Sequence, residues 1–250
     1  NGANYFSTIN SSNTQGLVGT DYTNAIRLLS NKDDYQFNII VAPGLTYANT
    51  TTQLDSIVSL AESRGDCIAV IDLVNYDSTL AGATTKALSL NTSYGASYWP
   101  WVQMRSATGR NEWCPASVVI PGVYAFTDAA AAPWFAPAGL VRGGIPGVIQ
   151  TERRLSKSDR DNLYAGKVNP IATFPGTGIS IMGQKTLQSK ASALDRVNVR
   201  RLLIDLKKFI GDQARTLVFE QNTISTRNKF LAAVNPYLES VVQRQGLYAY

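Results

Sequence analysis

The sequence predicts an α/β fold, in which a core of parallel strands and helices is followed by a C-terminal α+β region. Three observations support this prediction. Short, almost wholly apolar runs such as residues 67–73 are typical of parallel strands covered on both faces. Segments with helical spacing of apolar residues lie between these runs. The chain has 250 residues, of which 44% are hydrophobic, and this is enough for a sizeable buried core.

The first part of the chain alternates between strand and helix patterns. In the clearest helix, Leu54, Ile57 and Ala61 are spaced as one buried helix face. Pro100 lies inside a strand-like run and indicates an edge strand or a bulge. This order of elements predicts a right-handed parallel unit. Its expected elements are the strand 37–44, the helix 51–63, the strand 67–73, the helix 78–90 and the strand 97–104.

The second part is predicted to be more helical. Ser156 is expected to cap a short helix, with Asp159 at its third position. Gly211 is expected to end a long helix, and Pro236 to open the last one. The expected elements are the helix 118–132, the helix 155–164, the strands 169–174 and 178–183, the helix 196–210, and a helix from Asn235 to Gln245 that is stopped by Gly246 before a new strand begins.

We place a domain division at residue 160, between an α/β core domain (residues 1–160) and a C-terminal domain (residues 161–250). The chain does not begin with Met, and residues 1–10 are polar, without the basic and apolar pattern of a leader. We therefore expect a piece of a longer chain.

The composition excludes several kinds of site. The chain contains no histidine, which removes Ser-His-Asp catalysis, Cys-His catalysis and His-ligated metals. Two cysteines are too few for a structural zinc site. Cys67 is expected to be a buried free thiol, although its position leaves a disulfide with Cys114 open. No apolar run is long enough to span a membrane. We predict no catalytic residue, no cofactor and no metal site.

The net charge of +5 is spread along the chain rather than concentrated. Within the expected helix 196–210, Arg200-Arg201 and Lys207-Lys208 form pairs of adjacent cations. A nucleic-acid-binding protein would gather its basic residues in a stripe with interleaved aromatic residues. A modest basic surface that faces an acidic protein partner explains the charge at least as well.

The stretch from Gly178 to Leu187 nearly matches a phosphate-binding loop. Gly178 and Gly183 have the required spacing, but Gln184 stands where the loop needs lysine. The residues between the two glycines are β-like and no helix pattern begins at Gly183, so a phosphate cradle is not predicted. Asp72 lies near the end of the second strand, about where a ribose-binding carboxylate would lie, but the glycine loop is missing. A nucleotide-binding α/β enzyme is therefore the weaker alternative.

The same stretch belongs to a set of motifs that resembles the contractile tail sheath proteins, and myovirus sheaths most of all. Residues 168–187 resemble the start of the family's C-terminal domain, with Lys185 where arginine is usual. Residues 195–210 resemble the family helix R-x-I-N-V-R-R-L. Residues 216–223 resemble its F-E-P-N turn, with Gln221 for proline. The runs SYWPW and APWFAPAG resemble its y-x-P-W strand and its W-x-A-P-A turn.

This resemblance implies a structural subunit of a contractile phage tail sheath, not an enzyme. Family subunits polymerise as stacked hexameric rings around the tail tube and exchange terminal arms as strands. They contract to drive the tube through the host envelope during genome delivery. The implied partners are other copies of the chain, the tail tube protein, and the baseplate and tail terminator proteins, with no direct nucleic-acid contact and no membrane insertion. The implied location is the tail sheath of the virion, after assembly in the host cytoplasm.

The sheath of a phage-tail-like bacteriocin or of a type VI secretion system is the alternative within the same family. The family's N-terminal arm and last C-terminal strands are missing, so we expect a fragment of the subunit that lacks its terminal arms. The resemblance also points to candidate interface residues. Four candidates lie on the helix 196–210, namely Arg200, Arg201, Lys207 and Lys208. We expect them to face an acidic tube, and the alternative is an ordinary solvated face. Those expected in a strand layer that accepts a neighbour's arms are Gly246, Leu247, Tyr248 and Tyr250.

Overall fold

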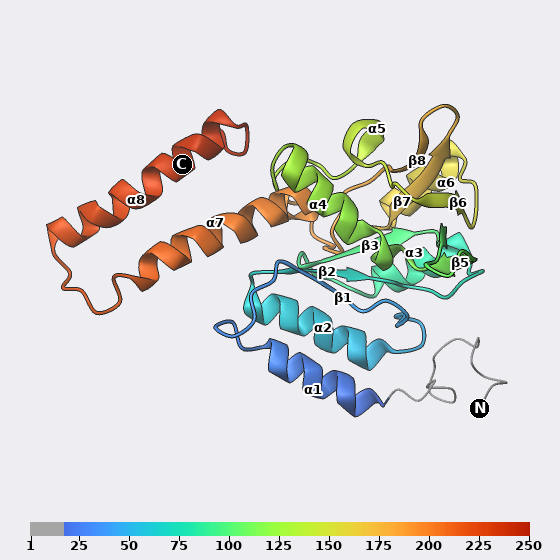
Figure 1. Cartoon of the computed structure of the whole chain (residues 1–250), viewed down its shortest axis with the longest axis horizontal. Helices are drawn as coiled ribbons and strands as arrows, with labels where there is room; N and C mark the ends of the chain where they lie inside the picture. Colours follow the sequence, from blue (N-terminus) through green and yellow to red (C-terminus); the bar gives the residue numbers. More distant parts are fainter. Residues whose placement is uncertain (1–17) are drawn as a thin grey trace.

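A computed structural model describes residues 18–250 and confirms the predicted α/β class (Figure 1). The polar residues 1–10, on which the prediction about a leader rests, lie outside the described residues. The strands are β1 (Ile39–Val41), β2 (Ile68–Ile71), β3 (Gly95–Trp99), β4 (Val102–Arg105), β5 (Asn111–Cys114), β6 (Val148–Thr151), β7 (Asn169–Phe174) and β8 (Gly178–Ile181). The helices are α1 (Gly19–Leu29), α2 (Thr51–Arg64), α3 (Leu80–Leu88), α4 (Ile120–Ala130), α5 (Gly139–Arg142), α6 (Lys157–Ala165), α7 (Val197–Arg215) and α8 (Ile224–Gln243).

The larger of two sheets has the strand order β1-β2-β3-β7-β8. Its first four strands are parallel, and β8 runs antiparallel to β7. The helices α2, α3 and α6 pack on one face, as right-handed crossovers require. The helix α4 and the first half of α7 pack on the other face. Strands β7 and β8 come from residues 161–250, so this sheet draws on both parts of the chain, and a domain division at residue 160 stays a prediction.

The strand β2 shows how the core is divided between the two faces. Ile68 and Val70 pack with α4 and α7, whereas Ala69 and Ile71 pack with α2 and α3. All four side chains are at most 2% exposed. Successive strand residues point to opposite faces, so a run that is apolar at every position requires cover on both sides. The prediction made from residues 67–73 is therefore confirmed.

Helix ends follow local signals that are visible in the sequence. At the start of α6, Ser156 Oγ accepts a hydrogen bond from Asp159 N at 3.1 Å, and Asp159 Oδ2 accepts one from Ser156 N at 2.9 Å. The predicted capping box is thus complete. At the end of α2, Gly65 has a φ of 68°, the left-handed conformation that glycine adopts without steric cost.

One predicted strand, 97–104, is split between the two sheets. The strand β3 ends at Trp99, and β4 pairs instead with β5 and β6 in a three-stranded antiparallel sheet. Pro100 lies between them, after a cis peptide bond. Because β3 is central in the larger sheet, the predicted edge position was wrong. Proline has no N–H for the ladder, and the chain leaves the larger sheet where this residue occurs.

The helices α7 and α8 form a hairpin that projects from the body of the protein (Figure 1). Two predicted breaks are wrong, because α7 continues through Gly211 and α8 continues through Pro236. A glycine inside a helix costs only about 1 kcal/mol. Beside the proline, Tyr237 stacks on Phe209 of α7 with ring centroids 3.9 Å apart, which keeps α8 aligned with α7. Residues 247–250 are irregular, so the strand expected after Gly246 is also not formed in the described chain.

The residues that nearly match a phosphate-binding loop form the strand β8 and, after it, a backbone segment that packs closely against β7. A Cβ atom at Gly183 would lie 2.8 Å from Asn169 Oδ1, so only glycine fits. The Asn169 side chain is fully buried and donates to Ser97 O at 3.0 Å and Lys185 O at 2.8 Å, while its Oδ1 accepts from Lys185 N at 2.6 Å. The glycine therefore allows close packing, and the predicted β structure is confirmed.

Both cysteines are free thiols, and Cys67 is buried, as expected. Burial raises the pKa of the Cys67 thiol to about 12. Within residues 18–250, no helix has the length and apolar character needed to cross a membrane. The same part of the chain holds no group of three His, Cys, Asp or Glu side chains arranged to bind a metal ion.

Asp72, at the end of β2, is a buried carboxylate that joins two elements. Its Oδ1 accepts a hydrogen bond from Ser117 N at 3.1 Å, and its Oδ2 accepts one from Ser117 Oγ at 2.5 Å. These bonds hold the 3-10 turn Ala116–Val118, which precedes α4, against the sheet. Burial raises the pKa of Asp72 to about 6.

We predict that Asp72→Asn changes how stability depends on pH. The pKa of about 6 in the folded state exceeds the ordinary value of 3.8, so the contribution of this group is present below pH 4 and is lost as pH rises through 6. The wild-type free energy of unfolding should fall by about 3 kcal/mol across this window through Asp72, and Asp72→Asn should remove that fall. Urea unfolding at a series of pH values measures it.

The control is Asp161→Asn, which removes an exposed carboxylate from α6 and should leave the wild-type pH profile intact. A profile of Asp72→Asn parallel to that of the wild type would contradict the assignment.

Candidate functional site on the α7–α8 hairpin

The helix α7 buries its first half and exposes its second half. Ile204 packs into the cluster that covers the sheet, and Leu202 and Leu206 pack with Trp134 and Val241 in a separate cluster. From Lys207 onward no residue of α7 is buried. The helix is therefore anchored in the body at its start, and its outer half lies outside the body.

Arg201, a predicted interface residue, lies inside the protein and is only 5% exposed. Its Nη2 forms an ion pair at 2.5 Å with Asp128 Oδ2 of α4. Its guanidinium lies 4.6 Å from the ring centroid of Tyr124. A buried guanidinium needs such partners to offset its lost hydration. Arg201 thus ties α7 to α4 and does not face outward.

Arg200 is also internal, with 4% of its surface exposed. Its guanidinium lies over the Tyr94 ring at 4.0 Å from the centroid, and Nη2 donates to Ser93 Oγ. Burial lowers the pKa of this guanidinium. The sequence held a signal for this burial, because Arg200 and Arg201 lie on the helix face of Val197 and Ile204 at positions i+3 and i+4.

Lys207 and Lys208, in contrast, are exposed where α7 leaves the body. Lys207 Nζ donates to Tyr94 Oη at 3.4 Å. Lys208 makes no hydrogen bond or ion pair with any other residue in the range 18–250. Of the four cations predicted on this helix, these two can meet another molecule without a change in the fold.

Of the residues predicted near the end of the chain, Gly246 and Leu247 lie beside Trp134, whereas Tyr250 Oη donates to Asn235 O at 3.4 Å and to Glu239 Oε1 at 3.3 Å on α8. A Cβ atom at Gly246 would lie 3.1 Å from the Trp134 ring, and Leu247 packs in the same cluster. Trp134 Nε1 also donates to the Arg244 carbonyl at 2.9 Å. Tyr248 is fully exposed, and the end of the chain is irregular. Gly246 and Leu247 therefore fasten the end of α8 to the body.

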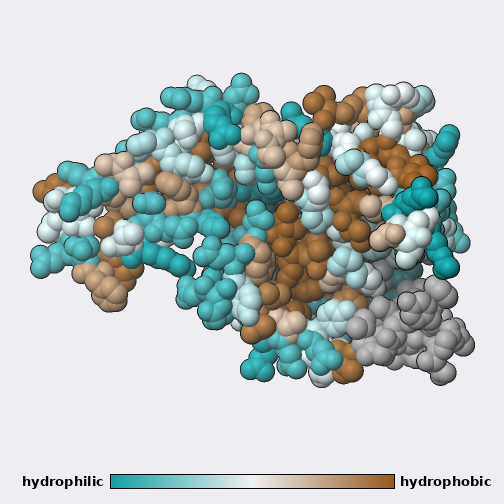
Figure 2. Space-filling model, in the orientation of Figure 1, coloured by the Kyte–Doolittle hydropathy of each residue, from teal (hydrophilic) through white to brown (hydrophobic). Residues whose placement is uncertain are grey.

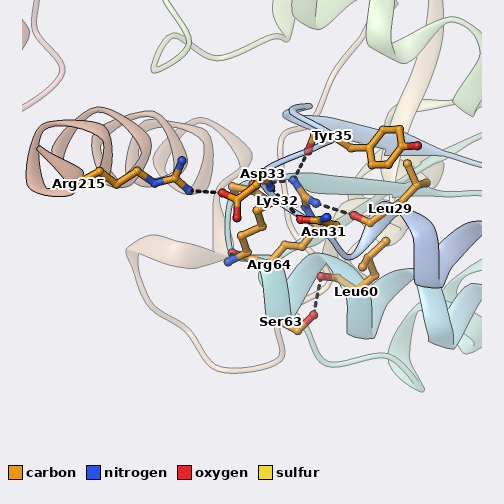
Figure 3. A network of polar contacts seen from close by, with 10 residues as sticks. Leu29, Asn31, Lys32, Asp33, Tyr35, Leu60, Ser63, Arg64 and Arg215 are labelled. Atoms are coloured by element: carbon orange, nitrogen blue, oxygen red, sulfur yellow. Dashed lines mark hydrogen bonds and ion pairs between the residues drawn. The ribbon is translucent and has the colours of Figure 1, made fainter. Parts of the chain in front are cut away.

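A hollow of about 300 Å³, lined mostly by charged residues, lies between the outer half of α7 and the connection from α1 to β1. We call it the basic groove, and its lining includes Lys32, Phe37, Arg64, Lys207, Lys208 and Arg215. Across it, Arg215 of α7 forms an ion pair at 3.1 Å with Asp33 (Figure 3). Sequence reasoning missed Lys32, Arg64 and Arg215, because nothing local relates the α1–β1 connection to α7.

Arg64, at the end of α2, fixes the wall of the basic groove that faces α7 (Figure 3). Its Nη1 donates to Leu29 O at 2.5 Å, and its Nη2 donates to Tyr35 O at 2.8 Å and to Asp66 Oδ2 at 2.8 Å. The guanidinium also lies 4.3 Å from the centroid of the Phe37 ring. One side chain therefore holds both ends of the α1–β1 connection.

Sequence comparison shows which known proteins this chain is similar to. The family model described as the phage tail sheath protein central domain matches residues 15–187. The tail sheath protein of Vibrio phage KVP40 is 31% identical over 91% of this chain and 38% of its own length. The tail sheath protein of Enterobacteria phage T4 is 29% identical over 96% of this chain and 40% of its own length. The chain thus spans about two fifths of the length of these curated relatives.

Structure comparison gives a consistent result. The sheath complex of the extracellular contractile injection system PVC, in its contracted state, matches with a TM-score of 0.74 and 27% identity, over 89% of this chain and 60% of that chain. The baseplate structure of the anti-feeding prophage matches with a TM-score of 0.73 over 91% of this chain and 59% of that chain. At 23% identity, the second match shows a shared fold alone.

We predict that Arg64→Lys loosens the α1–β1 connection. Lysine keeps the charge but cannot donate in the same fork or stack on Phe37 in the same way. Loss of these bonds to a buried guanidinium should lower the free energy of unfolding by about 2–3 kcal/mol and speed amide hydrogen exchange in residues 30–38. Chemical unfolding and exchange mass spectrometry measure the two effects. Arg27→Lys, at an exposed position of α1, is the matched control; equal exchange in both variants would contradict the role of Arg64.

Proposed function

The chain belongs to the phage tail sheath protein family, and from this premise we propose that it forms the body of a contractile tail sheath subunit. The match of the family model to residues 15–187 carries this proposal, together with about 30% identity to phage sheaths along nearly the whole chain. The family predicted from the motifs around Lys185 and in residues 195–210 is thereby confirmed. It is a family of structural proteins, not of enzymes.

In the proposed function, copies of the subunit polymerise as stacked hexameric rings around a tail tube. Contraction then rearranges subunits as rigid bodies and drives the tube through the host envelope to deliver the genome. The close-packed sheet and the buried ion pair between Arg201 and Asp128 support a body that moves as one unit. The free energy for contraction would be stored in subunit contacts at assembly.

The proposed partners are other copies of the chain, the tail tube protein, and the baseplate and tail terminator proteins. The proposed location is the tail sheath of a virion, with assembly in the host cytoplasm. A sheath of an injection system related to phage tails is the second candidate, because the PVC sheath shares both fold and 27% identity. The slightly higher identity to two phage sheaths favours the phage tail.

We assign the tube contact to Lys207 and Lys208, the exposed pair among the cations predicted on α7. Arg200 and Arg201 are occupied by Tyr94 and Asp128, so they support this surface from within. The residues Gly246 to Tyr250 are proposed to lead toward the strand layer in which neighbours exchange arms, although they form no strand in this chain.

Electron microscopy of the full-length subunit, expressed without other tail proteins, tests the proposed function. We expect striated hollow tubes, because the proposed exchange of arms between subunits needs no other tail protein. If the subunit stays dispersed at high concentration, purified tail tube is added. Failure to decorate the tube as well would overturn the assignment as a sheath subunit.

The tube contact has a separate test in the variant Lys207→Glu/Lys208→Glu. Reversed charges should repel an acidic tube, so decoration of purified tubes should fall at low salt. Lys229→Glu, at an exposed position of α8, changes charge on the same hairpin and should leave decoration unchanged. Normal decoration by the double variant would remove these two lysines from the tube contact.

A further inference from the structure

A second hollow adjoins the basic groove beside α7. The second hollow has a volume of about 260 Å³. Gln36, Phe37 and Lys208 line both hollows, so the two lie next to each other. The second hollow lies between α7 and the segment that leads into β1, the edge strand of the larger sheet. Two adjoining hollows suit an extended segment of another chain better than a compact small molecule.

The basic groove carries an excess of positive charge that the chain does not neutralise. It is lined by five cationic side chains and two carboxylates. Arg64 is paired with Asp66 at 2.8 Å, and Arg215 is paired with Asp33 at 3.1 Å. Three lysines, Lys32, Lys207 and Lys208, form no ion pair within the described chain. They are the groups that an incoming anion would meet.

The walls of the basic groove are held in place before any partner arrives. Arg64 fixes one wall through Leu29, Tyr35 and the Phe37 ring, and Lys32 Nζ donates to the Arg64 carbonyl. The opposite wall belongs to α7, which is anchored by its buried first half. Because both walls are already fixed, little conformational entropy of the groove would be lost when a partner binds, and the cost of binding would be smaller than for a mobile groove.

The chemistry of the basic groove favours carboxylates over phosphates or nucleic acid. Among residues 18–250, Phe37 is the only aromatic residue in its lining, and the Arg64 guanidinium covers one face of the ring, so the groove offers a nucleic acid no row of stacking surfaces. Gly65, the C-terminal cap of α2, lines the groove, and the helix carbonyls near it disfavour a dense negative charge. Asp212 also lines the groove and would repel a doubly charged phosphate more than a single carboxylate.

An apolar partner fits this surface less well. In the view of Figure 2, hydrophilic residues cover much of the hairpin, whereas a large apolar area lies on the body. The exposed apolar residues of the hairpin are at and near its bend, and Val218, Phe219 and Leu231 do not line the basic groove. The basic groove is thus recognised by charge rather than by hydrophobic burial.

We propose that the basic groove binds an acidic peptide segment of an assembly partner. The carboxylates of that segment pair with Lys32, Lys207 and Lys208. One carboxylate also replaces Asp33 on Arg215, which costs little because an exposed ion pair contributes only about 0–1 kcal/mol. This inference deepens the proposed function and rests on it for the identity of the partner, but not for the binding itself.

Binding is tested on the 250-residue chain with a fluorescein-labelled peptide of alternating glutamate and glycine, followed by fluorescence anisotropy. We expect saturable binding that weakens as salt rises, because exposed charges are screened beyond about 10 Å at 0.1 M salt. Lys207→Glu/Lys208→Glu should weaken binding about tenfold, and Lys32→Gln about threefold. Lys229→Glu is the control and should bind as the wild type does. Circular dichroism confirms that each variant is folded.

Inorganic polyphosphate and a thymidine oligonucleotide serve as competing probes. Tighter binding of either one, with loss in the same lysine variants, would show a site for phosphate polymers and overturn the proposal. Peptide binding that is equal in all variants, or no binding at millimolar peptide, would overturn it as well. Tubes formed by a subunit that fails the peptide test would leave the sheath function standing. Peptide binding by a subunit that neither forms tubes nor decorates purified tail tube would leave the peptide site standing without the sheath function.

Discussion

The packing of a single helix, α7, on the larger sheet is the interaction on which the rest of the structure depends. Its first half contributes Val197 and Ile204 to the cluster over the sheet, and Leu202 and Leu206 to the cluster around Trp134. The second cluster also receives Val241 from α8. The same helix therefore joins the body to the hairpin, sets the position of α8 and forms one wall of the basic groove. Without this anchor, none of these features would have a defined place.

Charge is used in two different ways along this helix. Arg200 and Arg201 are enclosed by aromatic rings and by Asp128, so their positive charge stabilises contacts inside the protein. Lys207 and Lys208, only two turns farther along, remain available to another molecule. Arginine suits the first role because its planar group stacks and pairs at once, and lysine suits the second because its ammonium group stays hydrated. A count of basic residues does not distinguish the two roles.

The sequence predicts local features well and distant pairings poorly. The apolar run of β2, the cap at Ser156 and the strands β7 and β8 depend on neighbouring residues, and all were predicted. The predicted breaks at Gly211 and Pro236 failed because packing between α7 and α8 outweighs local preference. The basic groove was not predicted, because Asp33 and Arg215 meet only through the fold. The burial of Arg200 could have been predicted from its position on the same helix face as Val197 and Ile204. A surface position was predicted instead, because the side chain is charged.

The projection of the hairpin has a mechanical consequence. The outer part of α7, from Lys207 to Arg215, extends about 13 Å beyond its buried root at 1.5 Å per residue. A sideways load at the bend between α7 and α8 acts on that root as a torque with this lever arm. Resistance at the root comes from the ion pair of Arg201 with Asp128 and from the docking of Gly246 on Trp134, and near the tip from the exposed ion pair of Arg215 with Asp33. Because an exposed ion pair contributes little, most of a pull on the tip would reach the sheet through the contacts at the root.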